Sequence, residues 1–126
     1  MNYTNNKPIY IQIAHDIVLK IVNEKIPLAS LLPSVRELSV LYTVTPKTIQ
    51  AVTKYLSENQ IIVKKASVGS VVTNDYIIVK NLHHKHGVEY AKEYILSMEK
   101  LSYSHNEIRE YLHKCLEGDD TDDNNE

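Results

Sequence analysis

The 126-residue sequence predicts a mainly α-helical chain with one small β-hairpin, followed by a short C-terminal part made of two helices. Three observations predict this fold class. Apolar residues recur at helical spacing in three segments before residue 60, and only two residues separate the second segment from the third. A β-branched stretch over 61–73 then changes the period. Two further helical segments follow, over about 82–100 and 104–117.

The first helix is expected from about Ile9 to Asn23. Pro8 can precede it because the N–H that proline lacks is not needed at a helix start. Pro27 prevents the helix from continuing, so residues 24–32 are expected to form a connector. The helix carries one wide apolar stripe made of Ile13, Ala14, Ile17, Val18, Ile21 and Val22.

The second helix is expected to begin after Ser34 and to end near Tyr42. Ser34 is a good N-cap residue, and Glu37 three positions later completes a capping box. Leu38 and Leu41 are expected to face the core.

The third helix begins after Thr45, a further N-cap candidate, with Pro46 at the first helical position, and runs to about Glu58. Two helices joined by so short a turn must cross at a steep angle, which is helix-turn-helix geometry. The residues expected on its buried face are Ile49, Val52 and Leu56.

A hairpin is predicted directly behind the third helix. The runs 61–65 and 70–73 are β-branched, and residues 66–69 form the turn between them. A hairpin in this position is a wing, so the sequence predicts a winged helix-turn-helix over roughly residues 8–73.

The C-terminal part is predicted to be a dimerisation segment of two helices. Ser104 and Glu107 form a second capping box, and Gly118 is a natural helix stop. The expected regions are therefore 1–75, 76–117 and an acidic, disordered tail over 118–126. The residues predicted to mediate dimerisation are Ala91, Tyr94, Ile95, Met98, Ile108, Tyr111, Leu112 and Cys115.

Charge is distributed unevenly along the chain. The net charge is −2, yet residues 1–75 hold eight basic and five acidic residues, a net charge of +3. Residues 76–126 hold six basic and eleven acidic residues, a net charge of −5. The N-terminal half is therefore the part that could meet phosphates.

The outward face of the third helix carries groups that could read DNA. Lys47 and Lys54 could neutralise phosphates, and Gln50 could bond adenine in a bidentate manner. Ala51 or the Thr48 methyl group could touch a thymine methyl. An ordinary solvated helix face is the alternative, and the lysine-bearing hairpin beside it makes that alternative weaker.

Three blocks of the sequence resemble the N-terminal domain of the GntR family of bacterial transcription regulators. They are Pro8–Ile13, Leu32–Leu38 and Val44–Ile49. The short remainder resembles the YtrA-like subfamily, in which a helix pair serves dimerisation. The resemblance implies a homodimer that binds an inverted-repeat operator in double-stranded DNA and acts as a repressor.

The chain also departs from the family pattern. Glycines are usual in the connector where Glu24 and Ala29 stand, and an arginine is usual at Ala51. Ser67 replaces a usual wing glycine. We therefore do not predict that this chain binds the usual operator sequence of the family. The residues predicted to bind DNA are Ser34, Arg36, Thr45, Lys47, Thr48, Gln50, Ala51, Lys54, Lys64, Lys65, Ser67 and Gly69.

Other function classes have less support. Ser/His/Asp, P-loop and dinucleotide-binding patterns are absent, so we expect no enzyme and no cofactor. His83, His84 and His86 could bind Zn²⁺ or Ni²⁺ or respond to pH, but a polar helix start is favoured and no metal is predicted. A small-molecule effector is left unspecified.

The single cysteine and the lack of a long apolar run or a secretory signal favour a cytoplasmic protein without a membrane partner. A winged helix used only for protein–protein interaction remains the alternative function, supported by the low net charge and by Ala51.

Overall fold

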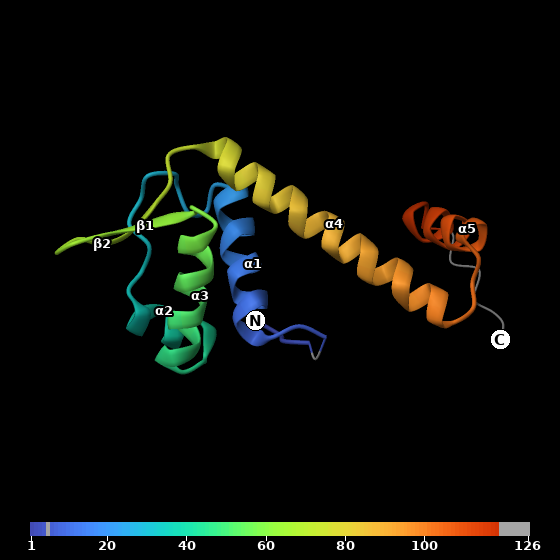
Figure 1. The fold of residues 1–126 in the computed structure, drawn as a ribbon, viewed down its shortest axis with the longest axis horizontal. Helices are drawn as coiled ribbons and strands as arrows, with labels where there is room; N and C mark the ends of the chain where they lie inside the picture. Colours follow the sequence, from blue (N-terminus) through green and yellow to red (C-terminus); the bar gives the residue numbers. More distant parts are fainter. Residues whose placement is uncertain (5, 119–126) are drawn as a thin grey trace. The chain divides into compact units, whose positions relative to one another are not determined.

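The computed structural model describes residues 1–4 and 6–118 (Figure 1). The chain divides into two compact units, and the division follows His86, inside the fourth helix. The helices and strands in the described residues are α1 (Ile9–Val22), α2 (Val35–Tyr42), α3 (Pro46–Glu58), β1 (Ile62–Lys65), β2 (Gly69–Val72), α4 (Tyr76–Lys100) and α5 (His105–Leu116). The predicted fold class, mainly α-helical with a two-stranded wing, is confirmed.

The core of the first unit forms where α1 and α2 pack against α3 (Figure 1). The predicted apolar stripe of α1 is buried, except that Val22 is half-buried at its end. Side chains from the wing and from the first turns of α4 complete this core. Its buried members are Ile13, Ala14, Ile17, Val18, Ile21, Leu32, Leu38, Tyr42, Ile49, Val52, Leu56, Ile61, Ile62, Val72, Val79 and Leu82.

The start of α2 and the burial of Leu38 are as predicted, but the position expected for Leu41 is not. Ser34 Oγ accepts a hydrogen bond from the Glu37 N–H at 3.1 Å, and Glu37 Oε1 accepts one from the Ser34 N–H at 2.9 Å. Leu41, expected to face the core, is 60% exposed. Tyr42 is buried instead, because the helix turns the 38 and 42 positions toward α1 and α3.

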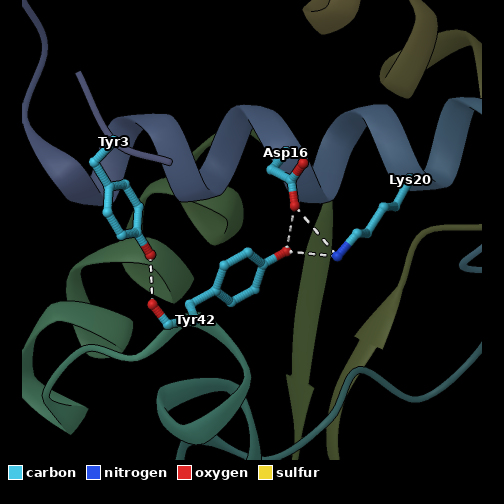
Figure 2. Close-up of polar contacts among 4 residues, drawn as sticks. All are labelled: Tyr3, Asp16, Lys20 and Tyr42. Atoms are coloured by element: carbon cyan, nitrogen blue, oxygen red, sulfur yellow. Dashed lines mark hydrogen bonds and ion pairs between the residues drawn. The ribbon is translucent and has the colours of Figure 1, made fainter. Parts of the chain in front are cut away.

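Tyr42 is the centre of a polar network that ties α1 to the end of α2 (Figure 2). Its hydroxyl donates to Asp16 Oδ2 at 2.7 Å and lies 3.2 Å from Lys20 Nζ, which also pairs with Asp16 at 3.3 Å. The Tyr3 hydroxyl donates to the Tyr42 carbonyl oxygen at 2.6 Å. Burial, followed by the hydrogen bond to Asp16 and its charge, raises the pKa of Tyr42 far above its usual value.

The wing is wider than the predicted hairpin. β1 and β2 pair antiparallel, with Ile62 opposite Val72. The connector then lies along the other edge of β2, since the Leu32 N–H donates to the Ser70 carbonyl and the Val72 N–H to the Ser30 carbonyl, both at 2.8 Å. These bonds attach the wing to the segment that leads directly into α2.

The fourth helix begins at Tyr76, six residues earlier than the predicted start at Leu82. Asp75 Oδ1 accepts the Ile77 N–H at 3.0 Å and so satisfies a donor of the first turn. Val79, Leu82 and His86 are buried in the first unit. The polar helix start favoured for 83–86 was therefore wrong in the position of the start and for His86, whereas residues 83–85 are exposed. The functional division at residue 75 stays a prediction.

The second unit holds the rest of α4 and α5. Its predicted capping box is present, with Ser104 Oγ accepting the Glu107 N–H at 3.2 Å. The Tyr103 and Tyr111 rings meet edge to face, with centroids 5.0 Å apart. Gly118 has a φ of 75°, as expected for a helix stop. The rest of the predicted disordered tail, 119–126, lies outside the described residues.

Among the helices of the described residues, we find none with the length and apolar character needed to cross a membrane.

Candidate nucleic-acid interface

The exposed side of α3 carries the polar side chains predicted to read DNA. Ile49, Val52 and Leu56 are fully buried, and this fixes the rotation of the helix about its axis. The recognition face is the set Lys47, Thr48, Gln50, Ala51 and Lys54. Its two lysines and Gln50 are exposed, whereas Thr48 and Ala51 are half-buried.

The beginnings of α2 and α3 hold three more of the residues predicted to bind DNA, Ser34, Arg36 and Thr45. Thr45 Oγ1 accepts the Thr48 N–H at 3.4 Å and lies 3.2 Å from Thr48 Oγ1. The Thr48 hydroxyl is therefore engaged in the cap, and its methyl group is the part suited to a base contact. Arg36 is exposed on the first turn of α2. Hydrogen bonds from Ser34 lower the pKa of Glu37, so this carboxylate is ionised at neutral pH.

An open groove of about 770 Å³ separates the wing from the start of α2. A second groove of about 460 Å³ adjoins it along α3. Thr53 and Lys64 line both grooves. The first is lined by Ser34, Lys64, Lys65, Ser67 and Gly69 among the predicted residues, and the second by Gln50, Lys54 and Lys64.

The two grooves bring together seven of the twelve predicted DNA-binding residues and leave five outside. Arg36, Thr45, Lys47 and Thr48 line neither groove, because they stand at the starts of α2 and α3. Ala51, further along α3, also lines neither groove. The sequence interpretation missed Thr53 and Ser57, which line the groove along α3. Their spacing of three and seven residues from Gln50 would have placed them beside the recognition face.

The backbone keeps a left-handed conformation at the three positions where the family pattern has glycine. Glu24, Ala29 and Ser67 have φ values of 61°, 64° and 65°. Non-glycine residues pay about 1–2 kcal/mol for this conformation. Gly69 has a φ of 120°, and a Cβ there would lie 3.3 Å from the Leu31 side chain. The connector and the wing therefore have the left-handed backbone conformation that favours glycine, although among these four positions this chain has glycine only at position 69.

The C-terminal positions predicted for dimerisation are largely uncovered in the single chain. Only Ile108 is buried, at 5% exposure. Tyr94 and Met98 are half-buried, and the exposed ones are Ala91, Ile95, Tyr111, Leu112 and Cys115. Within residues 1–4 and 6–118, no group of three or more His, Cys, Asp or Glu side chains is placed to hold a metal ion.

Comparison with solved structures decides the family. A GntR family transcriptional regulator from Listeria monocytogenes is 31% identical to this chain, and the match covers 89% of this chain and 98% of that one, with a TM-score of 0.73. The chain belongs to the GntR family of transcriptional regulators.

Two further relatives agree with this membership. The uncharacterized HTH-type transcriptional regulator YhcF of Bacillus subtilis (strain 168) is 28% identical over 116 residues, covering 92% of this family member and 96% of YhcF. YtrA from Sulfolobus acidocaldarius, a GntR-family transcription factor, is 25% identical, with a TM-score of 0.54 over 69% of this chain and 94% of that one. No model of a known protein family matches the sequence.

Proposed function

We propose that this GntR-family regulator binds a specific inverted-repeat operator as a homodimer and represses transcription. The observation that carries the proposal is the exposed recognition face on α3, flanked by a groove that leads to the lysines of the wing. An α-helix fits the major groove of B-DNA, where Gln50 could pair with adenine. Lys47, Lys54, Lys64 and Lys65 would neutralise phosphates.

The homodimer is supported by the exposed apolar side chains of the second unit. A pair of helices that buries a single large apolar residue has too small a core to be stable by itself. Eight of the exposed side chains are large and apolar, between 37% and 76% exposed: Val88, Tyr90, Ile95, Leu96, Leu101, Tyr111, Leu112 and Leu116. A second copy of the same segment would cover them, as a closed two-fold interface does.

A dimer would place two α3 helices in successive major grooves, about 34 Å apart, on one face of the DNA. The short C-terminal helix pair and the likeness to YtrA support assignment to the YtrA-like subfamily. We further propose a cytoplasmic protein that acts without enzymatic activity or a cofactor. The DNA-binding residues proposed here are those of the recognition face, the two helix starts and the wing.

The test begins by selecting a bound sequence from a pool of random DNA duplexes. Fluorescence anisotropy then compares the wild type with K47E/Q50E/K54E on the selected duplex. The matched control is K25E/K80E/N81D, which makes the same change in net charge at exposed positions away from α3. We expect the recognition-face variant to lose specific binding and the control to keep most of it.

Salt dependence gives a second criterion. Binding led by phosphate contacts should weaken steeply between about 50 and 200 mM salt. Equal binding by the recognition-face variant and the control, or the selection of no sequence, would refute the proposal.

A further inference from the structure

His86 on α4 is buried at 4% exposure, although its neighbours Lys85 and Gly87 are exposed. Its ring stacks on that of His15 from α1, with centroids 3.6 Å apart and planes at 25°. Its Nε2 lies 3.0 Å from the hydroxyl of Tyr55, which belongs to α3. One side chain thus connects α4 to α1 and to the helix that carries the recognition face.

The contact suits a neutral imidazole at His86. A neutral ring can accept the Tyr55 hydroxyl proton at Nε2, whereas an imidazolium would reverse this bond, donating Nε2–H to the Tyr55 oxygen, and would bury a positive charge away from water. A charge on His86 would also lie against the His15 ring in a place that water reaches poorly, where repulsion is strong. The titratable and charged groups that act on it are His15 on α1, Tyr55 on α3, His83 and Lys85 on α4, and Lys7 in the N-terminal segment.

Burial is the main cause that lowers the pKa of His86, to about 4, and the nearby basic groups, His15 first, add to it. A released His86 would titrate near 6.5. The stacked contact is therefore fully favoured above about pH 6.5 and is lost as the pH falls from there toward 4. The equilibrium for forming it changes by at most about ten-fold per pH unit.

His86 also occupies a special place along α4. Val79, Leu82 and His86 form the buried face of the helix, and the first unit ends directly after His86. Beyond it, α4 continues into the residues proposed for dimerisation. The contact with Tyr55 thus involves the last residue of α4 that belongs to the first unit.

We propose that His86 is a positioning residue for DNA recognition, which holds α3 through Tyr55 while neutral and releases it when protonated in mild acid. This inference rests on the proposed function. It makes operator binding sensitive to pH through a group that does not itself touch DNA.

The test uses the full-length chain and the duplex selected by the wild type. H86Q keeps an acceptor for the Tyr55 hydroxyl but cannot gain a proton, and H84Q is the matched control at an exposed histidine of the same helix. Between pH 7.5 and 5.5 we expect wild type and H84Q to lose affinity several-fold more than H86Q, with about ten-fold as the upper limit. Superimposable pH profiles of wild type and H86Q would overturn the proposal.

Two further measurements keep the outcome clear. Y55F, which loses only the hydroxyl, should bind the selected duplex several-fold more weakly at pH 7.5, and wild-type affinity in Y55F would contradict a positioning role. Urea unfolding without DNA should show an acid loss of stability in wild type that H86Q lacks. If no duplex is selected, the proposed function fails, while the unfolding profiles still decide whether the histidine contact titrates.

Discussion

Replacing Tyr42 with phenylalanine removes one hydroxyl from the network that joins α1 to the turn before α3. The hydroxyl donates to the Asp16 carboxylate at 2.7 Å, and the residue is only 4% exposed (Figure 2). A hydrogen bond to a charged group contributes about 1.5–3 kcal/mol. Asp16 keeps its ion pair with Lys20, and both are about one-third exposed, so part of the loss is offset. We therefore expect Y42F to lower the free energy of unfolding by about 2 kcal/mol.

The assay is urea unfolding at a fixed protein concentration, because dimerisation makes apparent stability depend on concentration. Y76F is the matched control, since Tyr76 is 42% exposed and the same hydroxyl is removed. We expect the control to change stability by less than about 0.5 kcal/mol. A loss in Y42F no larger than in Y76F would refute the account of this network.

Four other predictions follow from particular residues. S34A should lose about 1 kcal/mol of stability, since it removes the oxygen that caps α2; unchanged urea unfolding would contradict this. A29G should raise the free energy of unfolding by about 0.5–1 kcal/mol, because glycine adopts the φ of 64° without strain, and this gain exceeds the added entropy of the unfolded chain. A lower unfolding temperature of A29G would contradict this. A chain cut after His86 should stay folded but become monomeric and bind DNA more weakly, as sedimentation and anisotropy would show; a dimer would remove the role given to the second unit. Above about pH 10, wild type should lose stability that Y42F does not, because the folded state holds the Tyr42 proton while the unfolded state releases it; parallel alkaline curves would contradict this.

Signals that are local in the sequence predicted the helix starts correctly. Ser34 with Glu37 and Ser104 with Glu107 form the expected capping boxes, and Thr45 accepts the N–H that an N-cap should accept. Each of these bonds joins residues three apart, so sequence spacing is sufficient to find it. The rotation of α3, and with it the recognition face, followed from apolar periodicity in the same way.

Features that depend on distant segments could not be predicted. Leu41 and Tyr42 are adjacent, and the choice between them depends on where α1 places Asp16. The edge pairing of the connector with β2, such as the bond from the Leu32 N–H to Ser70, has no local signature. Helix α4 begins early although the Ile77–Val79 run is β-branched and has low helix propensity, because core packing of Val79 overrides propensity.

The site was predictable to the same extent as its elements. The sequence identified the outward residues of α3 and the lysines of the wing. The grooves between these residues depend on the hydrogen bonds that attach the wing to the connector, which the sequence does not reveal. His86 shows the limit most clearly. Its place in a polar run suggested an exposed helix start, whereas tertiary contacts with His15 and Tyr55 bury it.

The most direct test of the central claim is a hydroxyl-radical footprint of the wild type on its selected duplex. Two recognition helices on a two-fold dimer should protect two symmetric patches whose centres lie about 10 base pairs apart, on one face of the DNA. The K47E/Q50E/K54E variant should leave both patches open. A single asymmetric patch, or protection that survives in the variant, would contradict a dimer that reads DNA with α3.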